Sequence, residues 1–102
     1  MGYETALTAL ADPTRRRMYE RLRARPQPVG VLARQARISQ PAASQHLRVL
    51  LDARLVRVEP RGTRRIYHAT PDGLAELRRY FESLWGDALS SFRAYAEKEN
   101  RS

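Results

Sequence analysis

Apolar residues recur at intervals of three and four along much of the chain, which is the spacing of one face of a helix. This spacing predicts a short first helix that ends near Asp12 and a second helix that continues to about Arg23. The run Asp12-Pro13-Thr14 marks the second start, because Asp caps helices well and Pro loses no hydrogen bond at the first helical position. Two prolines in residues 25–28 then break the pattern. A short third helix follows, with a buried stripe at Val29, Leu32, Ala33 and Ala36.

A fourth helix is predicted from the break at residues 38–41 to about Ala53. Ser39 can cap this helix, and Pro41 lies in its first turn, where a lost N–H is tolerated. The predicted buried face consists of Ala43, Leu47 and Leu50. The opposite face is polar and consists of Pro41, Gln45, Arg48 and Asp52, with Ser44 beside them. A solvated face would more often carry Glu and Lys at its start, so we expect this face to contact a partner.

Two short stretches, residues 55–59 and 66–69, partly alternate apolar and polar positions and predict strands. The connection between them contains Pro and Gly and is strongly basic. A last helix is predicted over about 71–97, although Gly86 argues against an unbroken helix, since an interior Gly costs about 1 kcal/mol against Ala. Its near-heptad seam carries more apolar surface than a domain of this size readily covers. The seam consists of Leu74, Leu77, Phe81, Leu84, Ala88, Phe92 and Tyr95, with Trp85 and Leu89 alongside.

Composition and charge point to a polyanionic partner. The 102 residues are 42% hydrophobic and 29% charged, which fits a single folded domain over 1–102. The formal net charge is +8, and residues 13–65 hold fourteen arginines against three acids. Such a concentrated basic field favours nucleic acid. A genome biased toward Arg codons would explain the preference for Arg over Lys, but it would not explain why the two ends of the chain are balanced and the centre is not.

The third and fourth predicted helices have the size and spacing of a helix-turn-helix, whose second helix presents its first residues to base edges in the major groove. Gln45 can pair with adenine, Ser44 suits several bases, and Arg48 suits either phosphate or guanine. The arginines of the hairpin suit the DNA backbone or the minor groove. The complete set of candidate DNA-binding residues is Ser39, Gln40, Ser44, Gln45, His46, Arg48, Arg61, Arg64 and Arg65.

The two histidines and the arginines at residues 15–17 also have structural interpretations. We interpret His46 as a packing or phosphate-facing residue rather than a metal ligand, and His68 as a structural residue on a strand. The arginines at residues 15–17 cannot all point one way on a helix. One or two of them are expected to touch phosphate and at least one to be solvated or paired within the chain, for example Arg16 with Glu20.

Four segments together resemble the ArsR family of bacterial regulators, in the expected order over about residues 5–85: ADPTRR from Ala11, ISQPAASQHLRVL from Ile38, Leu55-Val56, and GTRRIY from Gly62. The second segment is the most specific. The resemblance implies a mainly α chain with a small β-hairpin: a winged helix-turn-helix with its wing at about 55–69. It also implies a homodimer that represses transcription from double-stranded operator DNA with two half-sites. The implied dimer interface lies on the first and last helices, at Leu7, Leu10, Leu77, Phe81, Leu84, Trp85, Ala88 and Phe92.

Several functions are not expected. The chain has no Cys, the last helix has no His, and residues 29–33 hold no ligand type, so we expect neither a metal site nor a cofactor. No Gly-rich phosphate loop or recognisable triad is present, so we expect no enzyme. We expect no membrane span, and the first residues do not resemble a signal peptide, which favours the cytoplasm. The inducing signal is left open.

Two alternatives compete with these interpretations. A helical protein-interaction module would account for the long seam, but it would leave the basic centre without a role. The aromatic residues Tyr3, Phe81, Trp85, Phe92 and Tyr95 could instead line an effector pocket, although a dimer core is the default interpretation.

Overall fold

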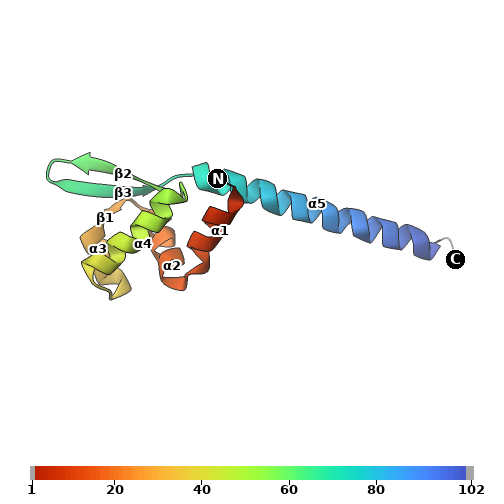
Figure 1. Cartoon of the computed structure of the whole chain (residues 1–102), viewed down its shortest axis with the longest axis horizontal. Coiled ribbons are helices and arrows are strands. Elements are labelled where there is room, and N and C mark those ends of the chain that lie inside the picture. Colours follow the sequence, from red (N-terminus) through yellow and green to blue (C-terminus); the bar gives the residue numbers. More distant parts are fainter. Residues whose placement is uncertain (1, 101–102) are drawn as a thin grey trace.

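The computed structural model describes residues 2–100, which form a helical body with a three-stranded sheet and one long projecting helix (Figure 1). In chain order the elements are α1 (Tyr3–Ala11), α2 (Pro13–Ala24), β1 (Gln27–Pro28), α3 (Val29–Ala36), α4 (Gln40–Asp52), β2 (Val56–Arg61), β3 (Arg64–Ala69) and α5 (Asp72–Asn100). The fold is therefore mainly α with a small β-hairpin, as the sequence predicts.

Both predicted helix caps are confirmed. The Asp12 side chain accepts a hydrogen bond from the Arg15 backbone N–H at 2.9 Å, and Pro13 occupies the first position of α2. The Ser39 hydroxyl oxygen accepts from the Ala42 backbone N–H at 3.1 Å and so fixes the start of α4. Short polar side chains therefore set where these two helices begin.

The turn between α3 and α4 is closed by backbone hydrogen bonds. Arg37 adopts a left-handed conformation with φ of 58°, and its N–H donates to the Arg34 carbonyl at 3.2 Å. The Ile38 N–H donates to the Ala33 carbonyl at 3.1 Å. This is the way many helices end, although Gly is more usual than Arg at the left-handed position. The turn sends the chain directly into α4.

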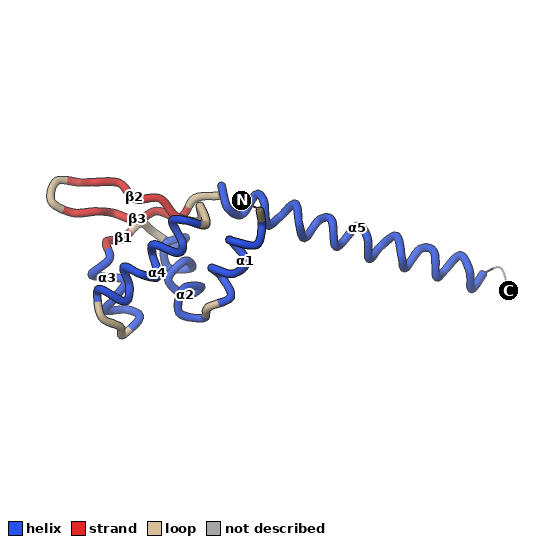
Figure 2. Tube along the Cα trace, viewed as in Figure 1, coloured by secondary structure: helices blue, strands red, loops and turns tan. Residues whose placement is uncertain are grey.

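The sheet has the strand order β1-β3-β2, with antiparallel pairing throughout (Figure 2). The strand β1 was not predicted, because its two residues lie in a proline-rich break; Gln27 pairs with Tyr67 and Pro28 with Ile66. The hairpin is longer than predicted, since Arg61 pairs with Arg64 directly across the turn. Gly62 has φ of 60°, the positive φ that the first position of a tight hairpin turn requires.

One apolar core joins α1, α2, α3 and α4 to the base of the hairpin and the start of α5. The predicted inner face of α4 lies at its centre, because Ala43, Leu47 and Leu50 are 0% exposed. Leu77 also belongs to this core and is only 7% exposed. Leu77 lies in the first turns of α5, where the helix still packs on its own chain, and its place in a dimer interface stays a prediction.

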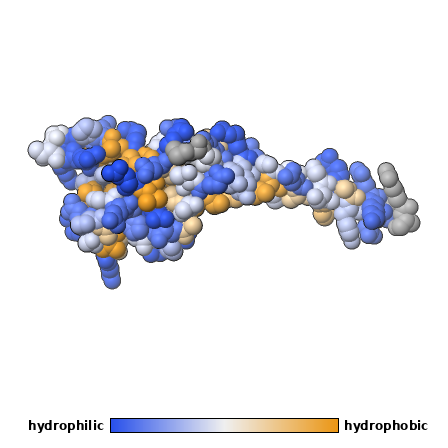
Figure 3. All heavy atoms as spheres, viewed as in Figure 1, coloured by the Kyte–Doolittle hydropathy of each residue, from blue (hydrophilic) through white to orange (hydrophobic). Residues whose placement is uncertain are grey.

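The helix α5 continues through Gly86 without interruption and leaves the body (Figures 1 and 2). The predicted last helix is therefore present and unbroken, because the cost of Gly86, about 1 kcal/mol, is small in a helix of 29 residues. The projecting helix gives the chain principal extents of 70 × 23 × 22 Å. Apolar residues reach the surface where α5 leaves the body (Figure 3).

Candidate nucleic-acid interface

The outer side of α4 is polar and fully accessible. Gln40, Ser44, Gln45 and Arg48 are all exposed, while the opposite side of the helix is buried in the core. The structure thus exposes all four predicted residues, with Ser44, Gln45 and Arg48 on the outer side and Gln40 at the helix start. Three of them are uncharged, and all four lie in the first three turns of the helix, which is the part that a recognition helix presents to base edges.

Two other predicted residues on this segment are engaged within the protein. Ser39 is exposed, but its hydroxyl oxygen caps α4. His46 is half-buried, and its Nδ1 atom lies 3.4 Å from Nη1 of Arg15 on α2. The imidazole therefore lies toward α2, away from the outer face that carries Gln45.

The hairpin presents a row of arginines. Arg61, Arg64 and Arg65 are exposed at and beside the turn. Arg61 donates through Nε to Oε1 of Glu59 at 3.2 Å, whereas neither Arg64 nor Arg65 forms an ion pair within residues 2–100. Glu59 also lies 3.9 Å from Nη1 of Arg57 and 3.6 Å from Nε2 of His68. Two positive charges at the tip are thus free for an outside anion.

The structure corrects the suggested pairing of Arg16 with Glu20. Glu20 pairs with Arg23 at 3.0 Å, and Arg16 instead donates to the Leu10 carbonyl at 2.9 Å. A helix end leaves its last carbonyls without partners, and a basic side chain that begins the next helix can reach them. The spacing of residues in the sequence did not show that the carbonyls at the end of α1 would take Arg16 as a partner.

Sequence reasoning also missed two basic residues beside α4. Arg34 and Arg37 are exposed on α3 and in the turn that precedes α4. They extend the basic surface on the side of the first helix of the helix-turn-helix. Their position directly before the predicted recognition helix is the signal that could have identified them.

The electrostatics of the α1–α2 junction favour a charged carboxylate. The Arg15 backbone N–H is the main cause that lowers the pKa of Asp12 below its ordinary value of 3.8, and the charge of Arg15 acts in the same direction against desolvation.

Among residues 2–100, no group of three or more His, Asp and Glu side chains is placed to hold a metal ion. No helix in the same range has the length and hydropathy needed to cross a membrane.

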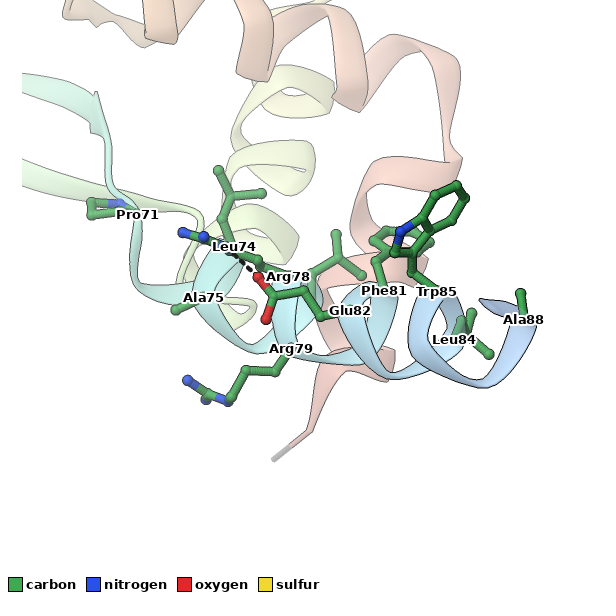
Figure 4. Close-up of a pocket in the computed structure, with 11 residues that line it drawn as sticks. Pro71, Leu74, Ala75, Arg78, Arg79, Phe81, Glu82, Leu84, Trp85 and Ala88 are labelled. Atoms are coloured by element: carbon green, nitrogen blue, oxygen red, sulfur yellow. Dashed lines mark hydrogen bonds and ion pairs between the residues drawn. The ribbon is translucent and has the colours of Figure 1, made fainter. Parts of the chain in front are cut away.

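An open apolar groove runs along the first half of α5, from Leu74 to Ala88 (Figure 4). Phe81 and Trp85 point to the same side of the helix, and the Arg78–Glu82 ion pair of 2.7 Å lies beside them. Of the predicted interface residues, Leu10 is half-buried, and six are exposed: Leu7, Phe81, Leu84, Trp85, Ala88 and Phe92. Tyr3 stacks on Tyr80 with ring centroids 3.7 Å apart, so the start of α1 is fixed to α5.

Comparison with known proteins agrees with this geometry. A family model described as a helix-turn-helix domain matches residues 10–59. The HTH-type transcriptional regulator Rv2034 of Mycobacterium tuberculosis is 48% identical over 96 residues, which cover 94% of this chain and 90% of that protein. The crystal structure of a possible transcriptional regulator for arsenical resistance is 44% identical, with a TM-score of 0.71 over 86% of this chain and 92% of that one.

An ArsR-like transcriptional regulator from Rhodococcus sp. RHA1 is 26% identical, with a TM-score of 0.76 over 92% of each chain. The chain belongs to the ArsR family of transcriptional regulators. This ArsR-family chain also shares its fold with the homodimeric winged helix-turn-helix DNA-binding domain of Mb0332 from Mycobacterium bovis. That domain is 23% identical, with a TM-score of 0.66 over 82% of this chain and 78% of the other. The winged helix-turn-helix fold that the sequence predicts is thereby confirmed. In this ArsR-family regulator, α3 and α4 form the helix-turn-helix and the β2–β3 hairpin forms the wing.

Proposed function

We propose that this regulator is a homodimeric repressor that binds a specific operator with two half-sites. The observation that carries the proposal is the outer face of α4, where an exposed and mostly uncharged polar surface lies between arginines that precede and follow it in the chain. Residues 1–102 act as one DNA-binding domain, whose wing spans about 55–69. Because the proposed operator would lie on the chromosome, we propose that the protein acts in the cytoplasm.

Sequence choice is assigned to the first half of α4. Gln45 can form two hydrogen bonds with adenine, and Ser44 can donate to or accept from several bases. Gln40 lies at the helix start, where free backbone N–H groups also suit a phosphate. Arg48 lies one turn further along the same exposed face and suits guanine or phosphate.

Affinity is assigned mainly to the surrounding arginines. Arg64 and Arg65 have no acidic partner within residues 2–100, so their charge can neutralise the phosphates beside the recognition helix. Arg61 adds to this contact on the wing. Arg37 is placed to reach the backbone on the other side, from the turn before α4. Such contacts orient the protein but carry no sequence information.

The dimer is assigned to the exposed apolar residues of α1 and α5. Trp85 and Phe92 are 68% and 70% exposed in the single chain, which is unfavourable unless another surface covers them. The Mb0332 domain, which has the same fold, is a homodimer. Two-fold symmetry would place two copies of α4 in successive major grooves, about 34–36 Å apart. A repressor bound there would occupy the promoter and exclude polymerase.

Selection of bound sequences from random duplex DNA tests the proposal, followed by titration of the selected duplex at several salt concentrations. We expect enrichment of a site with two-fold symmetry and affinity that weakens steeply with salt. Gln45→Ala should weaken the selected site by about 1–3 kcal/mol and relax the preference at one base position. An unchanged preference would remove Gln45 from the reading residues.

Arg64→Ala combined with Arg65→Ala should weaken all duplexes alike and reduce the salt slope by about one for each phosphate that the wing no longer neutralises. The matched control is Arg93→Ala combined with Lys98→Ala, which removes two positive charges from the exposed part of α5, away from the hairpin. If the control had the same effect, the wing would have no special role. A protein that binds no duplex, even in dilute buffer, would overturn the proposal and favour a helical protein-interaction module.

A further inference from the structure

The side chain of Arg15 joins three elements of the body. It is half-buried at the start of α2, where Nε donates to the Ala9 carbonyl at 2.9 Å and Nη2 donates to the Thr8 carbonyl at 3.3 Å. Both carbonyls lie in the last turn of α1. The third nitrogen, Nη1, lies 3.4 Å from Nδ1 of His46 on α4. One guanidinium therefore links the end of α1 to the recognition helix.

The position of His46 gives this link its importance. His46 follows Gln45 directly, but its ring lies on the side of α4 that packs toward the body. A neutral imidazole can accept a hydrogen bond at Nδ1 from a guanidinium, which has only donors to offer. Arg15 thus contacts the recognition helix within its reading segment, yet from the side opposite the DNA.

A second attachment fixes the other end of α4. The Gly73 backbone N–H of α5 donates to the Arg54 carbonyl at 2.7 Å, and Nη1 of Arg54 lies 3.6 Å from Oε1 of Glu76. These contacts tie the residues that follow α4 to the first turns of α5. The recognition helix is therefore held near its middle by Arg15 of α2, which also bonds the end of α1, and at its C-terminal end by α5.

We infer that Arg15 and His46 form a positioning contact that fixes the angle of α4 against α1 and thereby sets the half-site spacing that the dimer accepts. The inference rests on the proposed function, because α1 and α5 carry the exposed residues that would meet a second copy. With those two helices fixed across the dimer, any rotation of α4 moves its reading face relative to the other copy. Neither Arg15 nor His46 needs to touch a base for this role.

The test compares Arg15→Ala with the matched control Arg16→Ala. Both variants lose one positive charge and one side chain that caps α1, but only Arg15 also contacts α4. The probe is the duplex selected by the wild-type protein, together with versions whose two half-sites are moved apart or together by one and two base pairs. Affinity for each duplex is measured by fluorescence anisotropy, and the folded state is checked by thermal unfolding.

We expect the wild-type protein and Arg16→Ala to prefer one spacing sharply. In Arg15→Ala, the ratio of affinities between the preferred spacing and the other spacings should fall about threefold to tenfold, which is the scale of one hydrogen bond. The salt slope should be unchanged. A merely structural role would weaken all spacings equally. His46→Phe, which keeps a ring but removes the acceptor, should broaden the preference in the same way, and it decides the question if Arg15→Ala does not fold. His46→Asn, whose Oδ1 can take the place of Nδ1, should retain the narrow preference.

The outcomes separate the two proposals. If the wild-type protein binds with a sharp spacing preference and the folded variants keep it, the positioning contact is overturned while the proposed function stands. If Arg16→Ala broadened the spacing preference equally, the positioning contact would also be overturned. The broadening would then come from the loss of charge or from the end of α1. A wild-type protein that binds no duplex overturns the proposed function, and this inference with it.

Discussion

The body of the molecule and the outer part of α5 use similar apolar residues in opposite ways. In the body, Leu47 and Leu50 follow helical spacing and are completely buried against other elements of the same chain. In residues 81–100 the same spacing continues, yet no side chain there is buried. The difference shows that periodicity identifies the apolar face of a helix but not the chain that covers it. A face is buried only against a neighbour, and within residues 2–100 no element covers the outer part of α5.

The largest expected effect comes from placing a charge on the exposed seam. Trp85→Glu should weaken dimerisation by about a hundredfold or more, because the new carboxylate would be buried without a partner. The body should remain folded, since Trp85 is not part of its core. Sedimentation equilibrium measures the mass and circular dichroism the fold. Ser90→Glu is the control, because Ser90 lies on the opposite side of α5. A Trp85→Glu protein that remains dimeric would contradict this use of the seam.

Truncation of a leucine side chain to alanine should have different consequences in the two regions. Leu50→Ala should lower the free energy of unfolding by about 2–5 kcal/mol at every protein concentration, because it opens a cavity in the core. Leu89→Ala, at a site that is 48% exposed, should act only through the dimer. Its effect should therefore disappear when the protein is diluted below the dissociation constant of the dimer. Urea unfolding at several concentrations distinguishes the two, and concentration-independent destabilisation by Leu89→Ala would refute the distinction.

The junction between the regions can be tested with two glycines of α5. A Cβ at Gly73 would come too close to the Ala53 carbonyl oxygen, so Gly73→Ala should destabilise the protein by about 1–3 kcal/mol. A Cβ at Gly86 would meet nothing within 4 Å, so Gly86→Ala should stabilise the helix by up to about 1 kcal/mol. Thermal unfolding of the two variants measures both shifts. Opposite signs are expected, and a Gly73→Ala protein that is not destabilised would show that the close approach at Gly73 does not constrain the junction.

The smallest expected effect concerns the acid stability of the body. Because folding lowers the pKa of Asp12, its ionised carboxylate stabilises the fold above pH about 4, and this contribution is lost as the pH falls through the folded-state pKa. Asp12→Asn keeps a capping side chain but cannot titrate. We therefore expect a shallower loss of stability between pH about 4 and 2 than in the wild-type protein. Urea unfolding across this range checks the slope; identical slopes would assign the acid sensitivity to other carboxyl groups.

Local chemistry made much of the fold predictable. The caps at Asp12 and Ser39, with Pro inside the first turn that follows, placed the starts of α2 and α4 correctly. The strand β1 could not be predicted, because its pairing with β3 depends on residues about 40 positions away. The Arg15–His46 contact is equally non-local, spanning 31 positions. Spacing along one helix cannot show which side chain of another helix lies opposite.

The candidate site and the seam of α5 also differ in how far the sequence could predict them. The exposed face of α4 could be predicted residue by residue, since helical geometry alone puts Gln45 opposite Leu47 and Leu50, with Ser44 beside it. The role of Leu77 could not be predicted, because the seam of α5 looks uniform in the sequence. Only the packing of α5 on the body shows where the chain's own core ends and the exposed seam begins.

The amino-acid sequence by itself determined the helices, their apolar faces, the basic hairpin and the polar stripe of α4, because these depend on backbone geometry and on neighbours a few residues apart. The tertiary structure decided which apolar residues the chain covers for itself and which it leaves exposed. It also decided how α4 is attached to α2 and α5. Those outcomes depend on distances between segments that are remote in the chain, and such distances are fixed only when the elements pack together.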